Sequence, residues 1–156
     1  MSTENIVIVA ARRTPIGSFQ GALSSATGPD LSATATKACL ADTGIEGKNI
    51  AEALIGCVLP AGMGQAPARQ AVLAGGLPQS VGTTTVNKVC GSGMKATMLG
   101  HDMVLTGSAT IVLTGGMESM TNAPYLLPKA RQGYRMGHQE VLDHMFFDGL
   151  QNPYDG

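Results

Sequence analysis

Cys90 is the residue of this chain best placed for nucleophilic chemistry. It lies within Val-Asn-Lys-Val-Cys-Gly-Ser-Gly-Met-Lys-Ala (residues 86–96), between a β-branched run that predicts a strand and a run with helical spacing of apolar residues. A thiol at such a junction faces unpaired backbone N–H groups and the positive end of the helix dipole, which favour the thiolate. Gly91 and Gly93 leave room for a carbonyl group beside the sulfur. The pattern predicts acyl transfer through a covalent thioester.

The alternative reading of a single cysteine is a small buried hydrophobic residue without a chemical role. Cys39, in the middle of an expected helix, and Cys57, in an apolar run, fit that reading, because neither has a glycine-lined helix start beside it. On a regular strand Lys88 would project to the same face as Cys90 and lower the pKa of its thiol. A solvated lysine at the end of a strand explains Lys88 equally well.

The histidines offer no obvious partner for Cys90. His101 falls about three turns along the expected helix, too far to act as a base at its start. His138 and His144 lack the spacing of metal ligands on a helix, so we expect no metal site. Gly62-Met63-Gly64 lacks the third glycine of a dinucleotide-binding loop, and it is interpreted as a turn that leads into a helix.

Strand and helix patterns alternate through the first 119 residues. The order β-α-β-α-β-α-β predicts an α/β fold with a mostly parallel sheet covered by helices. Ligands bind beyond the carboxyl ends of such strands, where Cys90 and the run 115–119 both fall. The expected strands are Ile6–Ala10, Ala53–Leu59, Val81–Val89 and Ala109–Thr114. The first expected helix is capped by Asp30 or Ser32, runs through Ala41 and is stopped by Gly44, and the other two run from Ala66 to Ala74 and from Ser92 to Leu105.

The alternation is lost after Ser119, so we expect residues 1–119 to form the core and residues 120–156 to form an excursion from it. The excursion is richer in charged and aromatic residues. Its loose basic group is interpreted as a solvated loop in preference to a phosphate site. That group comprises Lys129, Arg131 and Arg135.

Composition narrows the class of protein further. The 156 residues are enough for one ordinary domain, and the charged fraction of 13% is about half the usual share. A net charge of -1 gives no electrostatic reason to expect nucleic acid or an anionic membrane as a partner. No apolar run approaches the roughly 20 residues of a membrane helix, and Met1–Asn5 lacks the basic start of a secretory leader. Three cysteines without a CxxC pair predict a reducing, cytoplasmic setting.

Five ordered blocks of the sequence resemble the thiolase family, and the version around Cys90 is similar to that of the acetyl-CoA C-acetyltransferases within it. Together the blocks extend over essentially the whole chain. They are Ala10–Gly21, Gly64–Gln70, Asn87–Ala96, Gly115–Tyr125 and Asp148–Leu150.

The resemblance implies a thiolase-like layered α/β/α half followed by the start of a CoA-binding loop domain. It implies that Cys90 takes an acyl group from acetyl-CoA and that its backbone amide contributes to an oxyanion hole. A second acetyl-CoA then condenses with the acyl group to give acetoacetyl-CoA, and thiolysis is the reverse. Met136 and Leu150 are expected to border the acyl and pantetheine pocket. CoA thioesters are the implied substrates, without a metal or other cofactor, and the complete protein is expected to be a homodimer or homotetramer.

The family's catalytic histidine, second cysteine and asparagine-containing oxyanion site come from segments that do not match this sequence. The resemblance therefore implies an N-terminal portion of a thiolase, inactive by itself in the complete reaction. Two alternatives remain. One is a thiolase for longer 3-ketoacyl-CoA substrates, and the other is a non-catalytic remnant or interaction module.

Overall fold

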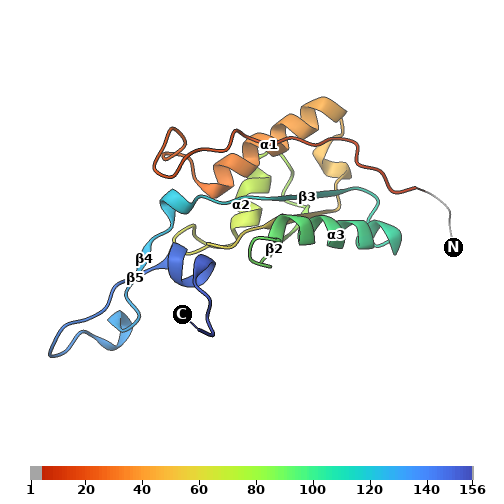
Figure 1. Cartoon of the computed structure of the whole chain (residues 1–156). Coiled ribbons are helices and arrows are strands. Elements are labelled where there is room, and N and C mark those ends of the chain that lie inside the picture. The colour runs from red at the N-terminus through yellow and green to blue at the C-terminus, as the bar shows by residue number, and fades with distance from the viewer. Residues whose placement is uncertain (1–4, 156) are drawn as a thin grey trace.

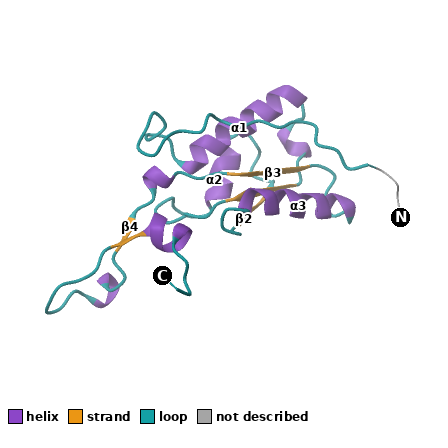
Figure 2. Cartoon of the chain, viewed as in Figure 1, coloured by secondary structure: helices purple, strands orange, loops and turns teal. Residues whose placement is uncertain are grey.

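Three parallel strands form the sheet that positions the candidate site. The computed structural model describes residues 5–155, so Met1–Glu4, part of the segment used to judge a secretory leader, lie outside the described residues. The strands lie in the order β2-β1-β3, with β1 at Glu52–Gly56, β2 at Gly82–Val86 and β3 at Val112–Gly116 (Figure 2). Gly56 pairs with Val86 on one side and Gly116 on the other, so all three carboxyl ends are level.

Helices cover both faces of this sheet, which confirms the predicted α/β class. Helix α2 (Pro67–Ala74) packs on β1 and β2 and carries α1 (Gly28–Thr43) on its other side. Helix α3 (Ser92–Leu105) packs on β1 and β3. Figure 1 shows α1 and α3 on opposite sides of the strands. The layers therefore follow the expected α/β/α arrangement.

Side chains along β1 point alternately to the two faces of the sheet, so β1 can pack against α2 on one face and α3 on the other. Ala53, Ile55 and Cys57 are buried in the core against the Ala68, Ala71 and Val72 side of α2. Gly56 faces the other way, and a Cβ atom built on it would lie 2.5 Å from the carbonyl carbon of Ser92. Only a glycine at this position lets the start of α3 lie directly on the end of β1.

Helix α1 begins earlier than predicted. Its N-cap is Thr27, whose hydroxyl accepts from the amide of Asp30, while the Asp30 carboxylate accepts from the amide of Thr27. This capping box starts the helix at Gly28, with its cap residue three positions before Asp30, the earlier of the two expected caps. Gly44, in the left-handed conformation, ends the helix as predicted.

The prediction of a first strand at Ile6–Ala10 is wrong. Ile6–Ala10 has no strand partner within the described residues, and the side chains of Val7, Ile8 and Val9 are largely exposed. An apolar β-branched run shows strand propensity, but a strand also needs a neighbour with which to form hydrogen bonds. The described order is therefore α-β-α-β-α-β. The structure also places the C-terminal ends of β1 and β2 three residues before the predicted ends, and it shifts β3 from 109–114 to Val112–Gly116.

The chain beyond Ser119 forms short elements that extend from the carboxyl end of the sheet, drawn in blue in Figure 1. Its two short strands pair antiparallel. The division of the chain into domains at residue 119 stays a prediction. The elements are η2 (Met120–Asn122), β4 (Tyr125–Leu126), η3 (Ala130–Gln132), β5 (Leu142–Asp143) and the π-helical turn η4 (Met145–Leu150). A further 3-10 turn, η1 (Gly47–Asn49), precedes β1. Among the described residues, no helix has the length and apolar character needed to cross a membrane.

Candidate active site

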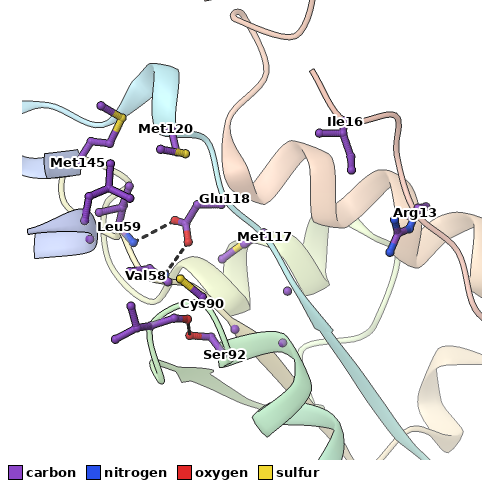
Figure 3. A pocket seen from close by; sticks show the side chains of 16 residues that line it. Arg13, Ile16, Val58, Leu59, Cys90, Ser92, Met117, Glu118, Met120 and Met145 are labelled. Atoms are coloured by element: carbon purple, nitrogen blue, oxygen red, sulfur yellow. Dashed lines mark hydrogen bonds between the residues drawn. The ribbon is translucent and has the colours of Figure 1, made fainter. Parts of the chain in front are cut away.

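A pocket of about 640 Å³ opens at the level carboxyl ends of the three strands (Figure 3). The segments that follow β1, β2 and β3 each contribute to its lining, and η4 closes one side. Cys90 and the Gly116–Glu118 run lie in this one pocket, as the strand-end argument indicated. The residues that line it are Arg13, Ile16, Gly56, Val58, Leu59, Val89, Cys90, Ser92, Gly93, Gly116, Met117, Glu118, Met120, Met145, Gly149 and Leu150.

Cys90 is exposed to this pocket from a tight turn between β2 and α3. The preceding residue, Val89, has a φ of 47°, in the left-handed region that a β-branched residue avoids. The amide of Gly91 donates to the carbonyl of Lys88 at 3.0 Å and closes the turn. This backbone strain occurs beside the one exposed thiol, and strain of this kind persists only where surrounding contacts hold it.

Two polar side chains provide those contacts. The hydroxyl of Ser92 accepts from the Lys88 amide at 2.8 Å and donates to the Val89 carbonyl at 2.6 Å, so it bridges the turn from the first residue of α3. The side chain of Asn87 accepts from the Val89 amide at 2.9 Å and donates to the Val58 carbonyl at 3.4 Å. The turn that presents Cys90 is therefore fixed both to α3 and to the segment after β1.

Lys88 does not lie on a strand, because β2 ends at Val86. The prediction that Lys88 and Cys90 share one face is therefore wrong, because it assumed that the strand extends through both residues. Lys88 is also absent from the residues that line the pocket. Its main-chain atoms hold the turn, as described above.

Glu118 supplies a carboxylate to the pocket beside Cys90 (Figure 3). Its two oxygens accept from the amides of Val58 at 2.8 Å and Leu59 at 3.0 Å. The Cys57 sulfur lies 3.6 Å from the same carboxylate. Burial, followed by the negative charge of Glu118 and the hydrogen bond to it, raises the pKa of the Cys57 thiol to about 11. Cys57 therefore keeps its proton at neutral pH and is enclosed, whereas the Cys90 side chain is exposed.

One wall of the pocket is apolar and comes from η4. Met145, Gly149 and Leu150 lie there, and a Cβ atom on Gly149 would lie 3.2 Å from the Leu59 side chain. The structure thus brings Leu150 to the pocket with Cys90. It leaves Met136 outside the lining, with 97% of its surface exposed. The roles of both residues in substrate binding stay predictions, and the geometry favours Leu150.

None of the described histidines lines the pocket. His101 is exposed on α3 beside Asp102, and His138 is exposed in the excursion. His144, in contrast, is buried and hydrogen bonded on both ring nitrogens. Within residues 5–155 there is no group of three or more His, Cys, Asp or Glu side chains arranged to hold a metal ion.

Four residues of the site and its surroundings were not predicted to have a role there: Asn87, Ser92, Glu118 and His144. An asparagine three residues before a cysteine at a helix start is a signal for a side-chain-stabilised turn, and it identifies Asn87 in retrospect. Ser92 is the first residue of the expected helix and could be recognised in the same way. Glu118 carries no local signal, because the amides from which it accepts lie 59 and 60 residues away along the chain. His144 has one local partner, Asp148, four residues further on, whereas its other ring partner, Ala61, is 83 residues away.

Comparison with known proteins identifies one matching family model and a group of similar chains. Residues 6–156 match the family model described as "Thiolase, N-terminal domain". The chain is 47% identical over 150 residues to an acetyl-CoA acetyltransferase of Chromobacterium violaceum, covering 96% of this chain and 38% of the relative. It is 47% identical over 156 residues to one from Schizosaccharomyces pombe, covering 100% of this chain and 40% of the relative. A probable acetyl-CoA acyltransferase of Staphylococcus aureus is 47% identical over 150 residues, with 96% and 38% covered. The chain thus spans about two fifths of the length of these relatives.

Proposed function

The chain belongs to the thiolase family, and on this premise we propose that Cys90 accepts an acyl group from an acyl-CoA as a covalent thioester. The observation that carries this proposal is the position of Cys90. It is an exposed thiol at the start of a helix, held at a strained turn and facing an open pocket. Nucleophilic cysteines need such access, and the amides of the first helical turn stabilise negative charge there.

In the proposed acyl transfer, the Cys90 thiol loses its proton to solvent and the thiolate attacks the thioester carbonyl carbon of acetyl-CoA. A new C–S bond forms, and the electron pair of the old C–S bond leaves with CoA, which takes up a proton. Negative charge develops on the carbonyl oxygen during the attack. We propose that the backbone amide of Cys90 is one donor to that oxygen, because Cys90 directly precedes Gly91, the N-cap of α3.

The complete reaction proposed for the full-length family member is the condensation of two acetyl-CoA molecules. The second acetyl-CoA gives up an α-proton to a base from the remainder of the full-length protein, and its carbanion attacks the acyl carbon on Cys90. The C–S bond to Cys90 then breaks, which releases the thiolate and acetoacetyl-CoA. Thiolysis reverses these steps. Because none of the described histidines lines the pocket, a polypeptide limited to these residues is expected to carry out acyl transfer without condensation. The family assignment also favours CoA thioesters as the only small-molecule requirement and a homo-oligomeric complete protein.

A second candidate is a thiolase that acts on longer acyl chains. The relative from Staphylococcus aureus, a probable acetyl-CoA acyltransferase, is as similar to this chain as two of the acetyl-CoA acetyltransferases are. Two of the residues that line the pocket, Leu59 and Met145 of η4, are bulky and apolar, which favours short acyl groups beside Cys90. Rates of Cys90 acylation by acetyl-CoA and octanoyl-CoA separate the candidates, and we expect acetyl-CoA to react faster.

The test of the proposed function is the intact mass of the chain after incubation with acetyl-CoA near neutral pH, followed by peptide mapping. We expect one acetyl group on Cys90 and none in the Cys90→Ser variant. Equal labelling of Cys39, or an adduct that persists in the variant, would show chemical acetylation without a site. The absence of any adduct would favour the non-catalytic module.

A further inference from the structure

His144 is the one buried histidine among the described residues, and the proposed acyl transfer does not use it. It directly precedes η4, whose Met145, Gly149 and Leu150 form the apolar wall of the Cys90 pocket. The wall belongs to an excursion whose residues 127–141 are all exposed. His144, by contrast, is only 5% exposed. A buried ring next to such an exposed segment needs specific contacts that hold it there.

Both ring nitrogens of His144 have partners on different segments. Nε2 accepts from the backbone amide of Ala61, in the segment after β1, at 3.4 Å. Nδ1 lies 2.5 Å from the carboxylate of Asp148, one turn further along η4. The His144 amide also donates to the Pro124 carbonyl at 3.2 Å. The ring therefore links the wall to the strand-end segment that carries Val58 and Leu59, two other lining residues.

These partners define the tautomer of the ring. A backbone N–H can only donate, so Nε2 must present its lone pair to Ala61. A neutral ring then carries its proton on Nδ1, where the Asp148 carboxylate accepts it. An imidazole in this state makes both hydrogen bonds at once. Protonation of Nε2 would set two donors against each other at Ala61.

We propose that His144 is a positioning residue that fixes the η4 wall of the Cys90 pocket through the neutral Nδ1–H tautomer. It sets how well the pocket holds an acyl-CoA and leaves the intrinsic reactivity of the Cys90 thiol unchanged. The wall also approaches the strand-end segment where Gly149 lies close to Leu59. Loss of the His144 ring would remove the directional hydrogen bond that links η4 to that segment. The affinity part of this inference rests on the proposed function.

The first test is the tautomer, measured by two-bond ¹H–¹⁵N correlation in the uniformly ¹⁵N-labelled chain, with His144→Gln used to assign the signal. We expect a protonated Nδ1 and an unprotonated Nε2 for His144. The exposed His138 serves as the internal reference and should show the Nε2–H form or a mixture. A protonated Nε2 on His144 would overturn the proposal without reference to any activity.

The second test uses variants that each remove one hydrogen bond. His144→Asn keeps an amide near the Nδ1 position and loses the Ala61 bond, whereas His144→Gln keeps an acceptor near the Nε2 position and loses the Asp148 bond. In each, we expect the acetyl-CoA concentration for half-maximal Cys90 acetylation to rise about five-fold, the effect of one typical hydrogen bond. The rate of Cys90 alkylation by iodoacetamide should not change, and His138→Asn should change neither quantity. An unchanged half-saturating concentration, or an equal loss with both reagents, would overturn the proposal.

The role of His144 can be tested even if the proposed acyl transfer is wrong. If wild-type Cys90 takes no acetyl group, the acyl-transfer proposal fails, and the positioning role is judged by the tautomer and by hydrogen exchange of the η4 amides. Faster exchange at Met145–Leu150 in His144→Asn, with no change in α1, supports a wall held by His144. Equal exchange in the variant and the wild type would contradict it.

Discussion

The three cysteines lie in different surroundings and should differ sharply in reactivity. Cys90 is exposed in the pocket, Cys39 is half-buried in α1, and Cys57 is buried beside Glu118. We expect iodoacetamide to label Cys90 first at pH 8 in the folded chain, and Cys57 last. In denaturant all three rates should converge. Peptide mapping over time measures this order, and early labelling of Cys57 would contradict the described burial.

The raised pKa of Cys57 also predicts a pH dependence. Its folded pKa of about 11 lies above the ordinary thiol value, so the folded state holds the proton more tightly than the unfolded state does. The resulting contribution to stability is fully present below about pH 8.5 and is lost as pH rises toward 11. Urea melts between pH 8 and 11 should therefore show a decline that is smaller in Cys57→Ala. A decline of the same size in both proteins would rule out Cys57 as its source.

The strained backbone at Val89 lies directly before Cys90, so a substitution there should change both the stability of the fold and the reactivity of Cys90. Its φ of 47° carries a cost of about 1–3 kcal/mol for a β-branched residue, which glycine avoids at an unfolded-state cost of about 0.5–1 kcal/mol. We expect Val89→Gly to be more stable by about 1 kcal/mol and to acetylate Cys90 about ten-fold more slowly, because the turn is less fixed.

The matched control for this substitution is Val86→Gly in the adjacent strand β2. Strand geometry suits valine, so this change should lower stability by about 1 kcal/mol. Chemical denaturation measures both variants. Destabilisation by Val89→Gly as large as that by Val86→Gly would mean that the turn is unstrained.

At the scale of elements, the site depends on how closely α3 approaches β1. A methyl group on Gly56 would lie 2.5 Å from the backbone of Ser92, whereas one on Gly115 in the neighbouring strand would meet only the Ile55 side chain at 3.8 Å. We expect Gly56→Ala to cost about 1–3 kcal/mol and to shift the start of α3, and Gly115→Ala to be nearly neutral.

Thermal unfolding compares these two variants, and iodoacetamide labelling of Cys90 reports the shift of α3. Slower labelling is expected in Gly56→Ala alone. Equal stability of the two variants would show that the close approach does not hold α3 in place.

The elements that the sequence predicted well are those whose stabilising residues lie close together along the chain. Helix α3 has the predicted bounds, Ser92–Leu105, because glycine and apolar spacing mark its start and its extent locally, and the glycine terminator of α1 is also local. Ile6–Ala10 was predicted incorrectly because strand formation depends on a neighbour that local sequence does not reveal. For the same reason, the contacts of Glu118 with Val58 and of His144 with Ala61 could not be predicted, because they join segments far apart along the chain.

At the scale of the whole molecule, several large apolar side chains are exposed. Met94, Met98 and Leu105 lie exposed on α3, and the Val7–Val9 run is also uncovered. Exposed apolar surface of this kind favours association. We expect sedimentation velocity to show a concentration-dependent increase in mean mass, reduced in the Met94→Lys, Met98→Lys double variant.

Met136→Lys provides the control for charge, because Met136 is also exposed but lies in the excursion, away from α3. This variant should associate as the wild type does. A wild-type chain that sediments as a monomer at all concentrations would contradict the expectation.

We propose that Cys90 is an acyl acceptor because of the folded structure around it, and not because of residues 86–96 alone. The most direct test is the second-order rate of Cys90 acetylation by acetyl-CoA in the folded chain, compared with a free peptide of residues 86–96. The held turn, the helix start and the pocket predict a rate at least about 100-fold higher in the folded chain. Equal rates would show that the described geometry contributes nothing to the chemistry and would contradict the proposed role of Cys90.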